Sequence, residues 1–245
     1  MTDVDLPAVC LLAGGRGKRL GTLTQEIPKP MVPVAGRPFI EWPLGQLRAA
    51  GFSRVVLCVG YLGDVIRDYV GDGERFGLDV AYSEDGPGLD GTLGAIRRAL
   101  PLLDDSVPIL YGDTYLSVDF AGVVRSHMKS GTTMTMTVLR NNGRWDTSNA
   151  VVEGGRVVAY CKAPPPPGAE WVDYGFAVID ASAVEGCAAA DLAVLTGDLA
   201  AAGRAAAWPA SERFREIGTP EALAATELFL RSLEAPGASE GEART

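Results

Sequence analysis

The sequence has a single histidine, His127, and no second histidine that could join it in a metal site. A histidine-based zinc site and a Ser-His-Asp triad both need imidazole in a defined setting, so this scarcity argues against both. No apolar run approaches the roughly 18 residues of a membrane span. The stretch from Met1 to Leu6 is polar and acidic, unlike a secretory signal. These absences predict a cytoplasmic protein that binds no membrane.

Positive charge is scarce as well. The chain has 22 lysine and arginine residues against 31 aspartate and glutamate residues, which gives a net charge of −9. A protein that grips the phosphate backbone of nucleic acid needs a basic face, so no nucleic-acid partner is expected. A nucleotide pocket is still compatible with this composition, because a few local cations are enough there.

The four cysteines lie far apart and form no CxxC pair. This spacing predicts buried thiols in a reducing cytosol. The sequence also has no internal repeat, and in particular no hexapeptide repeat of the kind that builds a β-helix. One common route to trimers is thereby removed, whereas a homodimer through a sheet edge or a helix face stays open.

Short apolar segments alternate with helical patterns in the first half of the chain. The expected strands are Ala8–Ala13, Arg54–Val59, Leu78–Tyr82 and Val107–Tyr111, and the expected helices are Pro38–Ala50, Leu62–Val70 and Thr92–Leu100. Strands separated by helices imply βαβ units, and therefore a mostly parallel sheet covered on both faces. We predict an α/β fold with three layers.

The pattern changes after residue 130. Strands are expected at Thr132–Leu139, Ala150–Val152, Arg156–Tyr160 and Val172–Ile179, with helix in part of Ala181–Ala207 and at Pro220–Leu230. Gly154 and Gly155 can both take positive φ, which indicates a hairpin. We expect one domain over residues 1–233, in which about 130–210 form an inserted β part. The tail, residues 234–245, has the composition of a disordered segment.

A glycine-rich turn follows the first strand. Gly14, Gly15 and Gly17 let backbone N–H groups approach an anion, and Lys18 and Arg19 add cationic donors. The spacing matches neither the Walker A loop nor the dinucleotide fingerprint, whose third glycine is missing. Taken alone, the turn indicates phosphate binding and a simple strand-to-helix turn about equally.

A second element comes nine residues after Leu20. In Ile27-Pro28-Lys29-Pro30-Met31, a lysine stands between two prolines on a stiff backbone. A lysine held in one direction suits a point charge aimed at a phosphate. A surface turn explains the same segment when it is considered alone.

The combination of motifs is much more specific. Seven motifs follow one another in order along the chain: the glycine turn with Arg19 and Leu20, Pro28–Met31, Pro33-Val34-x-Gly36-x-Pro38, Gly91-Thr92, Gly112-Asp113, Tyr160-x-Lys162 and Ile217–Pro220. This series, over roughly residues 8 to 222, resembles the signature of the sugar-1-phosphate nucleotidyltransferases. The resemblance implies a Rossmann-like nucleotidyltransferase fold with a mixed, mostly parallel sheet, in which the inserted part binds the sugar.

The family joins a nucleoside triphosphate to a sugar 1-phosphate and releases pyrophosphate. By resemblance, Lys29 contacts the α-phosphate, Arg19 holds the β- and γ-phosphates, and Asp113 is a Mg²⁺ ligand; these three are the expected catalytic residues. The nucleotide-binding set implied is Leu12, Ala13, Gly14, Gly15, Gly17, Lys18, Arg19, Glu84, Gly91, Thr92 and Asp113. Lys18 departs from the usual Thr or Ser, and it could add a phosphate contact.

The resemblance also implies an acceptor site and a metal site. Asn149, Lys162, Tyr174 and Gly175 are expected to contact the sugar phosphate. Glu216 occupies the place of the family's second metal aspartate, and its longer side chain shifts the carboxylate by about one methylene. Mg²⁺ is therefore the expected cofactor, with Asp113 and Glu216 as its ligands.

Glu84 precedes the segment that resembles the base-reading loop. A carboxylate accepts hydrogen bonds, which suits guanine or the amino group of cytosine better than uracil or thymine. Within the family, three segments (residues 27–31, 37–41 and 112–115) look most like the short heptose-1-phosphate guanylyltransferases. GTP and a heptose 1-phosphate are therefore the first substrates to test.

Three alternatives stay open. The enzyme could use UTP, CTP or dTTP, because short transferases for these nucleotides share much of the pattern. It could act on a phosphonate or another phosphate that is not a sugar phosphate. The departure at Glu216 also leaves open a non-catalytic sensor of nucleotide or sugar phosphate. Retention of Arg19, Lys29 and Asp113 argues against the sensor, since a sensor need not keep leaving-group contacts.

Overall fold

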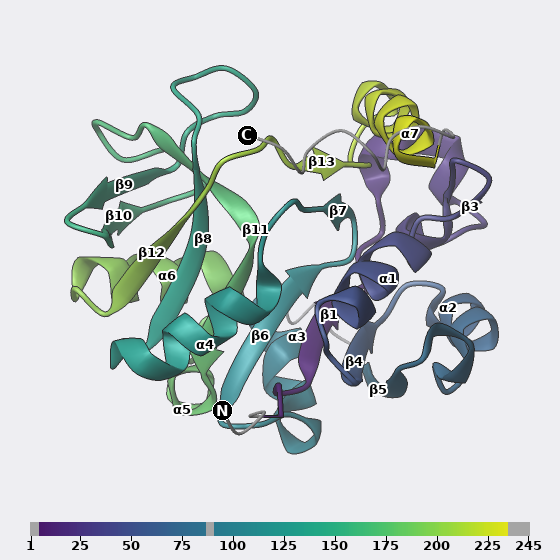
Figure 1. The fold of residues 1–245 in the computed structure, drawn as a ribbon, viewed down its shortest axis with the longest axis horizontal. Helices are drawn as coiled ribbons and strands as arrows, with labels where there is room; N and C mark the ends of the chain where they lie inside the picture. Colours follow the sequence, from purple (N-terminus) through teal and green to yellow (C-terminus); the bar gives the residue numbers. More distant parts are fainter. Residues whose placement is uncertain (1–4, 87–90, 235–245) are drawn as a thin grey trace, which may run out of the picture.

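A computed structural model describes residues 5–86 and 91–234 (Figure 1). Nine strands form one mixed sheet, and two short two-stranded ladders stand beside it. The strands of the large sheet are β1 (Val9–Leu12), β4 (Arg54–Val59), β5 (Asp79–Glu84), β6 (Ser106–Tyr111), β8 (Met134–Arg140), β9 (Ala150–Glu153), β10 (Arg156–Tyr160), β11 (Trp171–Asp180) and β12 (Ala205–Ala210). The residues predicted as a disordered tail, apart from Glu234, lie outside the described part.

The first half of the chain builds the parallel side of the sheet. The strand order is β5-β4-β1-β6-β11-β8-β12-β10-β9, and β5, β4, β1 and β6 run parallel. Cys10 of β1 pairs with Val56 on one side and Ile109 on the other, so β1 is central. A central parallel strand is buried on both faces, which is why these segments are continuously apolar. The α/β three-layer prediction is confirmed.

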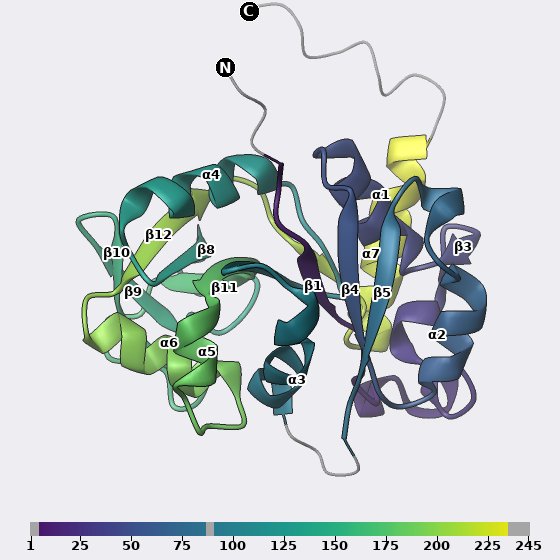
Figure 2. The same cartoon turned by 90° about the horizontal axis from the view of Figure 1, so that it is seen from below.

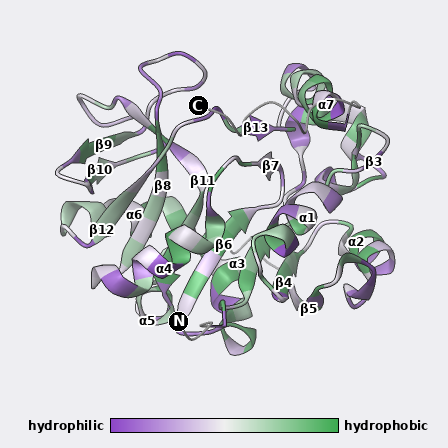
Figure 3. Ribbon diagram, viewed as in Figure 1, coloured by the Kyte–Doolittle hydropathy of each residue, from purple (hydrophilic) through white to green (hydrophobic). Residues whose placement is uncertain are grey.

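Helices cover both faces of the sheet. They are α1 (Glu41–Ala49), α2 (Gly63–Val70), α3 (Gly91–Ala99), α4 (Phe120–Ser130), α5 (Ala181–Glu185), α6 (Leu192–Ala201) and α7 (Pro220–Glu234), together with 3₁₀ helices at Lys18–Thr24, Lys29–Met31, Glu74–Phe76 and Leu100–Leu102. Figure 2 shows α4 on one side of the sheet and α3, α5 and α6 on the other. The hydropathy colouring in Figure 3 shows the apolar stretches of the central strands β4 and β6.

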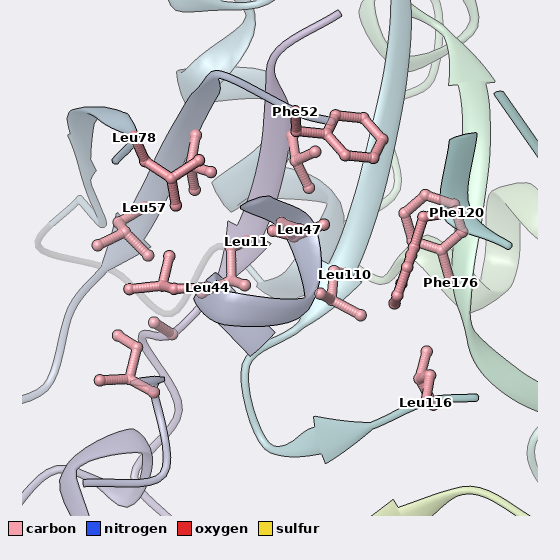
Figure 4. Packing of buried hydrophobic residues seen from close by; sticks show 14 of the residues in the cluster. Leu11, Leu44, Leu47, Phe52, Leu57, Leu78, Leu110, Leu116, Phe120 and Phe176 are labelled. Carbon is pink, nitrogen blue, oxygen red and sulfur yellow. The ribbon is translucent and has the colours of Figure 1, made fainter. Parts of the chain in front are cut away.

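Alternate residues of the central strands point into two separate cores. Leu11 and Leu57 pack with Leu44 of α1 and Phe120 of α4 in one core (Figure 4). Cys10 and Cys58 belong to the core on the other face, beneath α3 and α6. Both thiols are free and buried, with 3.4 Å between the two Sγ atoms, as predicted, whereas Cys161 and Cys187 are free but only half-buried.

The second half adds antiparallel pairing. β11 runs antiparallel to β6 and to β8, and its register shifts between Asp173 and Ala177. The predicted hairpin is present: β9 and β10 pair antiparallel, and Gly154 and Gly155 have φ values of 54° and 76°. The strands of this half therefore belong to the same nine-stranded sheet as the parallel strands of the first half.

Two elements were not predicted. The helix expected in part of Ala181–Ala207 is present as α5 and α6, but the last three residues of that segment begin the strand β12, which runs parallel to β8. Gly203 takes a φ of 68° just after α6, which reverses the chain, and the pairing with β8 then overrides alanine's helix preference. Helix α4 was not predicted, although Asp119 caps it by accepting a hydrogen bond from the Gly122 N–H at 2.8 Å.

Four short strands complete the fold near the carboxyl ends of the parallel strands. β2 (Pro33–Val34) pairs with β3 (Arg37–Pro38), and β7 (Thr114–Tyr115) pairs with β13 (Arg215–Glu216). Pro38 lies in the first of these ladders, so α1 begins three residues later than predicted. Within the described ranges, the helices are all too short or too polar to cross a membrane.

His127 of α4 offers a stability test. Its ring is buried, and it lies 3.2 Å from both Thr135 Oγ1 and Asp180 Oδ1. Burial lowers the pKa of His127, against the opposing effect of Asp180. As the pH falls, His127 therefore takes up a proton in the unfolded chain before it does so in the folded one. The stability that the neutral ring contributes is present above about pH 6.5 and is lost as the pH falls through the lowered pKa.

We predict that the melting temperature falls more steeply between pH 7 and pH 5 in the parent chain than in His127→Gln. Thermal unfolding followed by circular dichroism at several pH values measures both slopes. Equal slopes for the two proteins would show that His127 does not contribute to the acid sensitivity.

Candidate active site

A cavity of about 280 Å³ opens at the carboxyl ends of β1, β4 and β6, where parallel α/β sheets place their ligands. Six segments contribute its walls: the turn after β1, the Lys29 segment, the end of β4, the residue after β5, the start of α3 and the end of β6 with the turn that follows it. The lining residues are Leu12, Ala13, Gly14, Gly15, Lys29, Pro30, Cys58, Asp85, Gly91, Thr92, Ala95, Tyr111, Gly112 and Asp113.

The glycine turn is held against the neighbouring strand. The Ala13 N–H donates to the Cys58 carbonyl at 2.8 Å, and the Gly14 carbonyl accepts from the Tyr61 N–H at 3.3 Å. A Cβ on Gly14 would lie 2.3 Å from Asp85 Oδ2 and 3.2 Å from the Gly60 N, so a larger residue there would displace the Asp85 carboxylate. Gly17 has a φ of 60°, and a Cβ there would lie 3.1 Å from Lys29 Cβ. The turn and the lysine segment are therefore in contact.

Lys29 forms an ion pair with Asp113 at the cavity wall. The lysine starts a 3₁₀ helix and its side chain is only 10% exposed, whereas the Asp113 side chain is 30% exposed. A nearly buried ammonium needs a counter-charge, since an uncompensated one costs several kcal/mol. The structure thus brings Gly14, Gly15, Lys29 and Asp113 to one cavity.

Glu216 lies beside Asp113. It pairs with Thr114 in the β7–β13 ladder, and the Ile217 N–H donates to the Asp113 carbonyl at 3.1 Å. Burial raises the pKa of Glu216, and the Asp113 charge raises it further, while Lys29 and Arg19 act in the opposite direction. Two carboxylates that repel each other in this way are a donor set suited to Mg²⁺, which commonly takes one or two carboxylates plus phosphate oxygens.

The two cations of the turn point away from the cavity lining. Lys18 lines a separate open hollow with Arg16 and Thr22. Arg19 lies near Glu216, because a Cβ on Gly218 would be 2.9 Å from the arginine Nη2 and 2.8 Å from Glu216 Oε2. Arg19 is thus placed at the Glu216 side of the site.

The structure does not bring Glu84 to the cavity. Its carboxylate is 68% exposed and pairs with Arg67 at 2.6 Å, on an outer hollow beside α2. Asp85, the next residue, lines the cavity instead, against the backbones of Gly14 and Gly60. Adjacent residues at a strand end face opposite ways, so the carboxylate that lines the cavity is the one that follows the predicted Glu84.

The start of α3 connects the cavity to Lys162 through Asp191. The Thr92 hydroxyl donates to Asp191 Oδ1 at 3.0 Å, and Lys162 Nζ lies 3.5 Å from the same oxygen. Gly91 has a φ of 68°, and a Cβ there would lie 2.4 Å from the Ala190 carbonyl oxygen. Sequence reasoning missed Asp191, although an aspartate directly before an apolar helical run is a helix-cap signal.

The predicted sugar-contact residues separate into different roles. The Asn149 side chain accepts a hydrogen bond from the Asp173 N–H at 2.9 Å, which fixes β11. The Tyr174 ring is buried in the core with its hydroxyl at Ser117, and burial raises its pKa to about 12. Gly175 faces the site, since a Cβ there would lie 3.5 Å from Thr114 Oγ1.

Asp173 is the acidic group of this region that was not predicted. It accepts hydrogen bonds from the Gly175 N–H at 3.0 Å and the Tyr160 hydroxyl at 3.2 Å. Burial raises the pKa of Asp173, opposed by the Gly175 N–H and Lys162. The register shift of β11 begins at this residue, and a one-residue irregularity of that kind gives little signal in a sequence.

The fold and the site define a class of nucleotide-handling α/β proteins, and comparison with known proteins identifies the family. The model of the nucleotidyl transferase family matches residues 8–157, and the chain belongs to that family.

Named relatives differ in their nucleotides. The chain is 40% identical over 117 residues to the N-acetylmuramate alpha-1-phosphate uridylyltransferase of Neisseria meningitidis, covering 47% of this chain and 51% of that protein. It is 32% identical over 153 residues to the D-glycero-alpha-D-manno-heptose 1-phosphate guanylyltransferase of Aneurinibacillus thermoaerophilus, covering 61% and 65%. The chain thus spans between half and two thirds of these relatives.

The fold is shared with solved structures. HddC from Yersinia pseudotuberculosis superposes with a TM-score of 0.76 at 23% identity, over 92% of this chain and all of that one. The nucleotidyltransferase fold expected from the sequence is therefore confirmed.

Gly14 and Gly45 form a matched pair for testing the cavity. We predict that Gly14→Ala weakens nucleoside triphosphate binding at least tenfold, about 1.4 kcal/mol, because its Cβ would meet Asp85 and the Gly60 N–H. Gly45→Ala, at an exposed position of α1 outside the cavity lining, meets nothing within 4 Å and is the control. Isothermal titration calorimetry measures both affinities. Equal effects of the two substitutions would contradict the placement of the triphosphate against the Gly14 wall.

Proposed function

We propose that the chain transfers a nucleotidyl group from a nucleoside triphosphate to a sugar 1-phosphate and releases pyrophosphate. The observation that carries this proposal is the convergence of the glycine turn, Lys29 and Asp113 on one cavity. Family membership supports the same reaction type. An enzyme of this kind needs no nucleophilic side chain, which agrees with a chain that has one buried histidine.

The reaction brings two anions together, so its chemistry is charge neutralisation and positioning. A phosphate oxygen of the acceptor attacks the α-phosphorus in line, and the bond from that phosphorus to the bridging oxygen breaks. The electron pair leaves with pyrophosphate. Lys29 neutralises charge that develops on the α-phosphate, and Gly14 and Gly15 bind the phosphates through backbone N–H groups. Arg19 binds the departing phosphates.

Asp113 and Glu216 are the proposed ligands of a Mg²⁺ ion. Burial and the neighbouring Asp113 charge both raise the pKa of Glu216, and a cation shared by the two carboxylates would offset their repulsion. Among the described residues there is no group of three or more His, Cys, Asp or Glu side chains that could hold a metal, so phosphate oxygens complete the proposed coordination. Mg²⁺ supplies charge neutralisation of the phosphates when bound.

The acceptor site is proposed on the other side of the Asp113 turn. Lys162 binds the acceptor phosphate, and its weak pairing with exposed Asp191 leaves the ammonium free to exchange partners. Gly175 lets the sugar approach β11 closely. Asn149 and Tyr174 act here by fixing β11, through the contacts to the Asp173 N–H and to Ser117. Residues of about 130–210 thus supply the sugar-binding part.

GTP and a heptose 1-phosphate remain the first proposed substrates. A carboxylate at the cavity wall supports guanine, whose N1–H and amino group both donate hydrogen bonds. Asp85 is the proposed acceptor for these two donors, and Glu84, which lies outside the cavity, serves as the control residue. The same substrate tests would also reveal the use of UTP or another triphosphate, or of a phosphonate acceptor.

A cytoplasmic location and a homodimer stay predictions.

We predict that Lys29→Ala lowers the rate of pyrophosphate release at least tenfold, about 1.4 kcal/mol in the barrier, with the fold intact. The reason is the loss of the cation at the α-phosphate. Pyrophosphate release is measured with a coupled assay at saturating substrates. Lys129→Ala, on the exposed end of α4, is the control. An unchanged rate in Lys29→Ala would refute the role of this lysine.

We also predict that GTP with Mg²⁺ raises the melting temperature more than ATP, CTP, UTP or dTTP, and that Asp85→Asn removes this preference whereas Glu84→Gln keeps it. The change at Asp85 replaces one hydrogen-bond acceptor by a donor facing guanine. A thermal-shift series with the five triphosphates measures it. A preference for UTP, or loss of selectivity in Glu84→Gln alone, would contradict the assignment.

A further inference from the structure

A second hollow, of about 210 Å³, lies beside the β7–β13 ladder. The loop between β8 and β9, the segment before β13 and helix α7 form its walls, and Figure 1 shows this loop and β13 above the carboxyl end of β6. We name it the arginine hollow after Arg19, Arg213 and Arg215, which line it together with Trp145, Asp146 and Glu216. Arg19 and Glu216 join it to the proposed active site.

The three arginines form no ion pair with any described carboxylate, in a chain whose net charge is −9. Acids lie near two of them without pairing: the charge of Glu212 acts on Arg215, and Glu216 lies near Arg19. Seven other described arginines form an ion pair with a carboxylate. Three convergent guanidinium groups repel one another, and that cost falls when an anion binds between them.

Arg215 shows this cost most clearly. Its Nε is buried and has no hydrogen-bond partner within the described part of the chain, and its guanidinium lies 4.4 Å from the centre of the Phe229 ring. A buried donor without a partner is unfavourable, and an anion bound in the hollow would offset that cost.

Two acids, Asp146 and Glu216, also line the hollow. The Asp146 carboxylate accepts a hydrogen bond from the Thr147 N–H at 2.6 Å, and Glu216 is a proposed Mg²⁺ ligand. Trp145 supports the opposite wall, with Arg213 and Arg144 at 6.0 Å and 5.5 Å from its ring centre. The hollow therefore presents guanidinium groups, whose paired N–H donors match the oxygens of phosphate.

We propose that the arginine hollow receives the pyrophosphate leaving group after transfer. This inference rests on the proposed function. Arg19 lines the hollow and lies at the Glu216 side of the proposed active site, so a pyrophosphate that it holds there passes to Arg213 and Arg215 with one cationic contact kept. No covalent bond forms or breaks in the hollow, because the phosphorus–oxygen bond is already cleaved at the α-phosphate.

Binding of sodium pyrophosphate to the nucleotide-free protein in metal-free buffer tests the proposal. Isothermal titration calorimetry is expected to show Arg213→Ala weakening pyrophosphate binding at least fivefold. Arg144→Ala is the matched control, because Arg144 contacts the same indole ring but does not line the hollow. Arg213 is exposed, and Arg213→Lys serves as a second variant if the alanine variant fails to fold.

The same variants titrated with glucose 1-phosphate separate the two sources of phosphate. Weaker pyrophosphate binding in Arg213→Ala, with unchanged glucose 1-phosphate binding, supports the proposal. Equal losses in Arg213→Ala and Arg144→Ala indicate only a general positive field and overturn it. A loss confined to glucose 1-phosphate assigns the hollow to the acceptor and also overturns it. Failure of the proposed function is distinguishable, because these titrations require no turnover.

Discussion

A nearly buried lysine that must keep a carboxylate beside it is the constraint on which this structure depends. Lys29 lies between two prolines under the glycine turn, and Asp113 ends the strand next to β1. Their ion pair connects segments 84 residues apart and sets the width of the cavity between them. A cation held in this way does not have to be ordered when an anionic substrate arrives, so the site is preorganised for phosphate.

The rest of the site is arranged around that pair by the topology of the sheet. The parallel strands deliver Gly14, Asp85 and Asp113 to one edge. The antiparallel half brings Gly175 against the Asp113 turn, and the β7–β13 ladder places Glu216 on its other side. The nucleoside triphosphate, the acceptor phosphate and the leaving pyrophosphate are thus proposed to lie on three sides of Asp113. This arrangement suits a reaction in which two anionic substrates repel each other.

The sequence predicted the parallel half of the fold well, because periodicity reports burial directly: β4 has the predicted bounds, and so does β10 in the antiparallel half. It missed elements that long-range pairing decides, such as β12, whose alanines favour helix until β8 pairs with them. In the site, the family resemblance implied that Lys29 and Asp113 belong together, and the structure brings them into contact. It could not show which of two adjacent acids faces inward, nor that Asp191 and Asp173 come from distant segments to the same region.

A crystal structure with Mg²⁺ and a non-hydrolysable GTP analogue tests the central claim most directly. The account predicts the triphosphate along Gly14 and Gly15, with the Lys29 ammonium moved from Asp113 onto the α-phosphate and Asp113 turned to the metal. A triphosphate bound elsewhere, or one that leaves the Lys29–Asp113 pair intact and distant from its phosphates, would contradict it.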